Sequence, residues 1–175
     1  LWQLCVETGL QALAIPEAQG GSGLGMTELM LVLQAQGGAL GQVPLWRHQL
    51  AAATLAQFAQ ASLSSWAVEA AAGRALLTLD LSGLHTAQGM RLHARAADGG
   101  GRIDGQVGAL ALAEQSQAAL LLVSVEGQPR LALIELANTA IKPVAGRMTH
   151  GEAIADLHID GLLIGAEHLL PAAAL

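Results

Sequence analysis

The chain has 175 residues, of which 53% are hydrophobic and 13% charged, and its formal net charge is −6. This composition excludes intrinsic disorder, and the acidic balance argues against nucleic-acid binding, which needs a basic face to neutralise phosphates. The single cysteine, Cys5, excludes a disulfide framework and a multi-cysteine metal site, and it fits a cytoplasmic, reducing setting.

No membrane span is expected from the sequence. The longest uncharged stretch, residues 50–68, has the length of a span but carries several Thr, Gln and Ser side chains. Hydrocarbon does not tolerate so many polar groups, so the stretch is expected to form a buried helix and a loop.

Apolar residues recur with helical spacing in the first part of the chain. The patterns predict helices over residues 1–12, 26–39, 45–61 and 66–72, with Ser64 or Ser65 as the cap of the last one. Trp46 and Trp66 lie in these patterns and are expected to anchor the core or a domain interface.

In the second part of the chain, apolar and polar residues tend to alternate with a period of two. Short strands are predicted over residues 75–81, 91–96, 102–110, 118–125, 131–136 and 154–160, with a three-glycine turn at residues 99–101 and a hairpin turn at 126–129. Short strands at such intervals indicate a small antiparallel β-barrel or sandwich. The fold class is therefore α+β, with an amino-terminal helical domain followed by this β-domain.

Two rows of polar side chains stand out within these strands. Asp156, His158 and Asp160 share one face of a strand, and they could ligate a metal or simply face solvent; the apolar residues between them favour solvent. A similar row is formed by Arg91, His93 and Arg95. If their strands were neighbours, the two rows would pair as cross-strand charges.

The segment from Gly9 to Gly25 joins two of the predicted helices. It has an apolar run, then Pro16-Glu17, then glycines at positions 20, 21, 23 and 25. This order and spacing resemble the amino-terminal helical domain of acyl-CoA dehydrogenases. Looser similarities to the middle β-domain of the same family cover residues 101–106, 118–123 and 160–170.

The resemblance implies a division into domains and a reaction. Residues 1–73 would be the helical domain and residues 74–170 the β-domain, and residues 171–175 would begin a carboxyl-terminal helical domain that is absent from this chain. The family uses FAD to dehydrogenate an acyl-CoA thioester between its α and β carbons and delivers the electrons to a separate acceptor. Homo- or hetero-oligomers are expected. The base that removes the α-proton would lie in the absent domain, so no catalytic residue is assigned here.

The resemblance also suggests where FAD would lie. Ser82 falls in the turn after the first strand, where its hydroxyl could bond to the flavin ring. Leu110 and Ala111 fall in the second flavin motif of the family, which covers residues 105–112; in that motif Ala109 replaces an aromatic residue and Ala111 a hydroxyl. An alternative is therefore a non-catalytic, flavin-poor partner subunit of a hetero-oligomeric acyl-CoA dehydrogenase.

Overall fold

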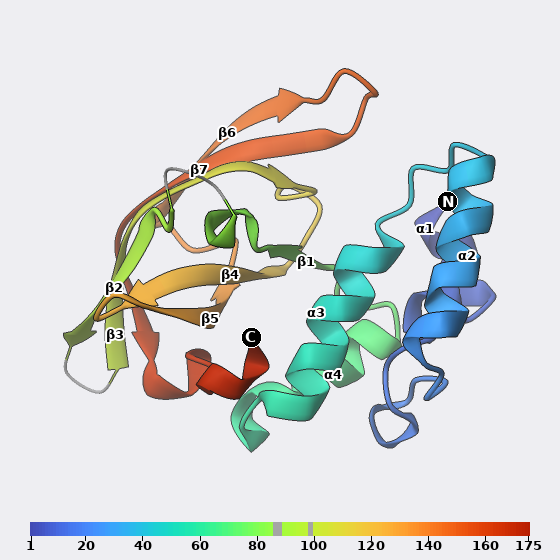
Figure 1. The fold of residues 1–175 in the computed structure, drawn as a ribbon, viewed down its shortest axis with the longest axis horizontal. Coiled ribbons are helices and arrows are strands. Elements are labelled where there is room, and N and C mark those ends of the chain that lie inside the picture. The colour runs from blue at the N-terminus through green and yellow to red at the C-terminus, as the bar shows by residue number, and fades with distance from the viewer. Residues whose placement is uncertain (86–88, 98–99) are drawn as a thin grey trace. The chain divides into compact units, whose positions relative to one another are not determined.

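The computed structural model describes residues 1–85, 89–97 and 100–175, and these divide into two compact units, Leu1–Leu77 and Thr78–Leu175. Within the described residues, the α-helices lie in the first unit, and the strands lie in the second apart from the first residue of β1 (Figure 1). The α+β fold class is confirmed.

The first unit is built from short and medium helices. They are α1 (Trp2–Glu7), α2 (Met26–Gly38), α3 (Leu45–Phe58) and α4 (Ala61–Ala71), with 3-10 turns at Leu10–Ala12 and Glu17–Gln19. The first helix is shorter than expected, because Gly9 adopts a φ of +75° and ends it. The fourth begins earlier than expected, directly after Gln60, so neither Ser64 nor Ser65 caps it.

The core of this unit is organised around α3. One stripe of the helix is buried, and it includes polar as well as apolar side chains: Leu45, His48, Gln49, Ala52 and Leu55. The two tryptophans expected in the core differ from this pattern. Trp46 is 39% exposed, with the Arg47 guanidinium 4.4 Å from its ring centre, and Trp66 is partly buried.

Two buried glutamines connect the Gly9–Gly25 segment to the helices. The Gln49 side chain accepts the Ala14 N–H at 2.7 Å and donates to the Leu10 carbonyl at 2.9 Å. Gln11 donates to the Ala71 carbonyl at 2.7 Å. These bonds satisfy backbone groups that no helix or strand pairs, and they fix the segment against α3 and α4.

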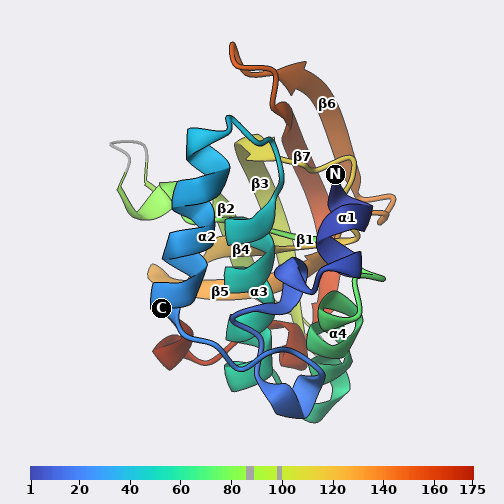
Figure 2. The same cartoon turned by 90° about the vertical axis from the view of Figure 1, so that its right-hand side faces the viewer.

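The second unit is one curled sheet (Figure 1). Its strands are β1 (Leu77–Asp80), β2 (Leu92–Ala97), β3 (Gly100–Ala111), β4 (Ala118–Val125), β5 (Gln128–Glu135), β6 (Ile141–Arg147) and β7 (Ala153–Gly165). The order is β1-β4-β2-β3-β7-β6, and β5 pairs with β4. Figure 2 shows the β6–β7 hairpin at one side of this sheet.

The inner face of the sheet forms the core of the second unit. Alternate residues of β2, β3 and β7 are buried there, including Leu92, Ile103, Val107, Leu157 and Ile159. The alternation that predicted these strands is thus also the pattern that fills the core.

The sheet is mixed rather than purely antiparallel. The β2–β3 pair and the β4–β5 pair are antiparallel, but His93 and Ala94 of β2 pair in parallel with Ser124 and Val125 of β4. The reason lies in the path of the chain: it reverses between β2 and β3 and reverses again before β4, so β4 runs in the same direction as β2.

The two polar rows do not lie on neighbouring strands. β3 separates β2 from β7, so the expected cross-strand pairing of Arg91, His93 and Arg95 with the row on β7 is wrong. All members of both rows are exposed. Part of the expected three-glycine turn, Gly99, lies outside the described residues.

Candidate functional site

A cleft of about 150 Å³ lies in the second unit at the end of β1. Its lining comes from four strands and their ends: Asp80, Ser82, Gly83, Gly89, Met90, Arg91, Leu92, Gln106, Val107, Gly108 and Leu122. The cleft contains the Ser82 turn and part of the β3 segment that the sequence assigned to flavin, so the fold brings these two regions together.

The position of the cleft follows from the pairing of β4. β5 pairs with the whole length of β4, so β1 and β2 share the opposite edge of that strand. β1 ends at Asp80 and β2 begins at Leu92, and the space between them lies over Leu122 of β4. The parallel register of β2 with β4, extended by two residues, sets Arg91 beside Leu122.

Gly105 allows the neighbouring strands to approach closely beside the cleft. Its φ is +134°, and a Cβ at this position would lie 2.0 Å from the Arg91 carbonyl oxygen. Only glycine fits both the backbone conformation and the contact. The glycine of the predicted motif thus sets the distance between the Arg91 backbone and β3.

Ser82 is held by Asp80 in a local turn. The Ser82 hydroxyl donates to Asp80 Oδ2 at 2.9 Å, and the Ser82 N–H donates to Asp80 Oδ1 at 3.3 Å. The hydroxyl proton is therefore directed at Asp80, and the oxygen of Ser82 keeps lone pairs that can accept a hydrogen bond.

Arg91 is held by Gln106 at the same cleft. Arg91 Nη2 donates to Gln106 Oε1 at 2.6 Å, and the Arg91 carbonyl accepts the Gln106 N–H at 3.3 Å. A guanidinium carries five N–H donors, more than this contact uses. Sequence reasoning noticed Arg91 only as part of a polar row, because its position beside the Ser82 turn depends on the β2–β4 register.

Leu110 and Ala111 do not line the cleft. Both side chains are buried, with 1% and 3% of their surface exposed, and the Ala111 carbonyl accepts the Thr78 hydroxyl at 2.8 Å. Their assignment to FAD stays a prediction, and it would have to work through backbone groups.

The neighbouring residue Ala109 lies on an irregular part of β3. The β3–β7 register shifts between Val107 and Leu110, and Ala109 has a φ of +52°. Its N–H donates to Asp156 Oδ1 at 2.7 Å. This irregularity exposes Ala109, and it directs the Ala109 N–H toward β7 rather than toward a ligand.

The described residues fit one edge of a flavin but not the full contact that the family motif implies. A hydroxyl, a carboxylate and a guanidinium line the cleft, but positions 109 and 111 offer neither a ring for stacking nor a hydroxyl. The volume is about half of the smallest usual ligand pocket, roughly 300 Å³. The cleft therefore suits part of a ligand whose remainder lies elsewhere.

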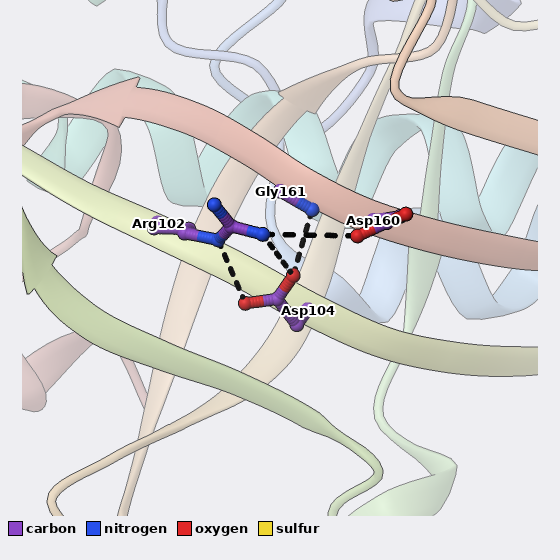
Figure 3. A network of polar contacts seen from close by, with 4 residues as sticks. All are labelled: Arg102, Asp104, Asp160 and Gly161. Atoms are coloured by element: carbon purple, nitrogen blue, oxygen red, sulfur yellow. Dashed lines mark hydrogen bonds and ion pairs between the residues drawn. The ribbon is translucent and has the colours of Figure 1, made fainter.

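The polar residues of β3 and β7 outside the cleft form a structural network (Figure 3). Asp104 accepts the Arg102 Nε–H at 3.2 Å and the Gly161 N–H at 2.7 Å, and Arg102 Nη2 lies 3.7 Å from Asp160 Oδ1. Arg102 and the Gly161 N–H lower the pKa of Asp104. This network joins β3 to β7 at the point directly after Ile103 where the register between the two strands shifts.

Neither the metal alternative nor a membrane span receives support from the described part of the chain. The acidic and histidine side chains described here form no group of three that could hold a metal ion. Among residues 1–85, 89–97 and 100–175, no helix combines the length and the apolar character needed to cross a membrane.

Comparison with known proteins identifies the first unit. Residues 1–74 match the family model described as acyl-CoA dehydrogenase, N-terminal domain. Acyl-CoA dehydrogenase FadE27 of Mycobacterium tuberculosis (strain ATCC 25618 / H37Rv) is 32% identical over 166 residues, which are 88% of this chain and 44% of that protein.

Solved structures match both units. A chain of the ChsE4-ChsE5 complex from Mycobacterium tuberculosis has a TM-score of 0.89 at 25% identity, covering 99% of this chain and 48% of that one. A glutaryl-CoA dehydrogenase from Mycobacterium smegmatis in complex with FADH2 shares the fold, with a TM-score of 0.83 at 16% identity, covering 99% of this chain and 49% of the other. The chain thus spans about half the length of these relatives. Residues 1–74 thus form an acyl-CoA dehydrogenase amino-terminal domain, and the chain as a whole is similar to the amino-terminal and middle portions of acyl-CoA dehydrogenases.

Proposed function

We propose that the protein takes part in FAD-dependent α,β-dehydrogenation of an acyl-CoA thioester, within an oligomer that passes electrons to a separate acceptor. The observation that carries the proposal is the cleft, which unites the Ser82 turn with β3 in a chain similar to this family. A protein with the same fold was crystallised in complex with FADH2, which supports the proposal. A cytoplasmic location fits the free, buried Cys5.

The proposed reaction removes a proton from the α carbon and a hydride from the β carbon. Bound FAD would supply the acceptor for the hydride. The part of this chain in the proposal is to hold one edge of the cofactor through Ser82 and its neighbours in the cleft. We assign no catalytic base within residues 1–175.

A second candidate function is a flavin-poor partner subunit of a hetero-oligomeric acyl-CoA dehydrogenase. Two observations favour it. The groups that would face a flavin are engaged elsewhere, since the Ala109 N–H bonds to Asp156 and the Ala111 carbonyl to Thr78. In addition, a structurally similar chain was crystallised as part of the ChsE4-ChsE5 complex.

The visible absorption spectrum of the protein purified without added cofactor separates the two functions. Flavin bands with about one flavin per copy of this chain would support the dehydrogenase function. A protein that stays colourless with added FAD would contradict it. If a flavin-containing second chain then co-purifies, the partner-subunit function is supported.

A further inference from the structure

We propose that Asp80 and Arg91 are the specificity-determining residues of the cleft, and that together they recognise the pyrimidine edge of the flavin ring. That edge presents an N–H between two carbonyl groups. This inference rests on the proposed function, because it names the residues that would select the flavin.

The cleft combines two opposite charges. Among the described residues that line it, Asp80 is the acid and Arg91 the base. Asp80 comes from the end of β1 and Arg91 directly precedes β2, and both lie at the edge of β4 that β5 leaves open. The buried side chain of Leu122, 6% exposed, provides an apolar surface in the same cleft.

Each of the two side chains is fixed by a neighbour and still has bonding capacity. Ser82 donates twice to Asp80, yet a carboxylate has about four acceptor sites. Arg91 donates to Gln106 at 2.6 Å and has further donors. A ligand would therefore meet an oriented acceptor and an oriented donor, which is what makes a polar contact specific.

The pair of charges decides which ligand chemistry fits. A phosphate or carboxylate would gain from Arg91 but would be repelled by Asp80 in the same small cleft. A neutral ring edge that both donates and accepts satisfies both residues at once. The N–H of the flavin pyrimidine would donate to Asp80, and a carbonyl beside it would accept from Arg91. The apolar Leu122 suits the flat face of a ring.

The inference is tested with FAD and with FAD methylated at the pyrimidine nitrogen, N3, using the protein with its natural partners. Quenching of flavin fluorescence gives Kd for the unchanged protein and for Asp80→Ala, Arg91→Met and Glu114→Gln. Glu114 is exposed and outside the cleft lining, so Glu114→Gln is the matched control. Unfolding midpoints show whether each variant folds.

We expect Asp80→Ala and Arg91→Met each to weaken FAD binding about tenfold or more, the scale of one lost charge-assisted hydrogen bond. Methylation of N3 should weaken binding to the unchanged protein and to Arg91→Met, but should cause little further loss in Asp80→Ala, because the acceptor for that N–H is already gone. The reduction potential of the flavin should fall in Arg91→Met, since a donor to the carbonyl stabilises the reduced, more negative ring.

Three results overturn the inference in different ways. If the complex binds no more FAD than its partner chains bind without this chain, the flavin-binding role proposed for this chain fails and the inference fails with it. If the unchanged protein binds FAD and the folded Asp80→Ala and Arg91→Met variants bind it equally well, only the inference is wrong. If methylation of FAD at N3 weakens binding equally in the unchanged protein and in Asp80→Ala, the assignment of Asp80 is also wrong.

Discussion

His48 is a buried titratable group of the first unit. Its Nδ1 accepts the Leu77 N–H at 3.1 Å, and the Trp2 ring meets it edge-on with centroids 4.8 Å apart. Burial lowers the pKa of His48 to about 4, and the nearby backbone of Ala70 opposes the shift only in part. The imidazole is thus neutral in the folded protein at physiological pH.

This lowered pKa predicts a loss of stability in mild acid. The unfolded chain binds the proton near pH 6.5 and the folded protein only near 4, so the free energy of unfolding falls as the pH drops through this window. A difference of about 2.5 pKa units corresponds to about 3 kcal/mol. Urea unfolding at pH 7.5 and pH 4.5 measures it. His48→Gln should lose this slope, whereas His158→Gln, at an exposed position, should keep it. Parallel pH profiles for all three proteins would contradict the assignment.

Gly105 and Gly108 offer a second comparison at the scale of single residues. Gly105→Ala should destabilise the fold by about 2 kcal/mol or more, because the new Cβ meets the Arg91 carbonyl and the backbone is in a region that only glycine tolerates. Gly108→Ala should have a much smaller effect, since the nearest atom to its Cβ would be Asp156 Oδ1 at 3.9 Å. Thermal and urea unfolding provide the measurement. Equal losses in the two variants would argue against the close approach at Gly105.

At the scale of elements, the Gly9–Gly25 segment depends on a side chain from another helix. Gln49→Ala removes the partners of the Ala14 N–H and the Leu10 carbonyl, and both groups lose hydrogen bonds that α3 provides. We expect a loss of about 2 to 4 kcal/mol in the free energy of unfolding. Gln57→Ala, on the exposed face of the same helix, should cost less than about 0.5 kcal/mol. Chemical denaturation of both variants tests the difference. A similar small loss of unfolding free energy in each would show that the Gln49 hydrogen bonds add little stability.

The sequence alone was enough to predict most of the elements, but not the contacts that depend on strand register. Periodicity predicted most helices and strands, because the stripe of α3 and the alternation of β7 are the patterns that bury apolar surface. The resemblance to the family also identified Gly105 as the glycine of a motif. Periodicity could not predict the Arg91–Gln106 and Asp156–Ala109 contacts, because both depend on strand register. The Arg91–Gln106 contact follows from the β2–β3 register, and the Asp156–Ala109 contact from the β3–β7 register, which shifts twice.

At the scale of the whole molecule, α2 is an unusually exposed apolar helix. Only Leu29 among its residues is buried, while Met26, Met30 and Leu31 are 52%, 57% and 62% exposed. Contiguous apolar surface of this kind promotes association. We expect residues 1–175 produced alone to self-associate, and Met30→Lys with Leu31→Glu to reduce the association. Size-exclusion chromatography with light scattering checks this, and a monodisperse monomer before any substitution would contradict it.

The pairing of the sheet has a consequence for how the protein is made. In the second unit, residues far apart in the chain pair with each other, as Val107 and Leu157 do between β3 and β7. Each helix of the first unit instead forms from hydrogen bonds between residues close in the sequence. Local structure forms in microseconds, but distant strand pairs must first close a long loop, which slows folding. During synthesis the helices can therefore form before β7 has left the ribosome, when β3 cannot yet pair with it. Until then β3 is an open strand edge, so newly made chains would be most vulnerable to aggregation in the interval before β7 emerges.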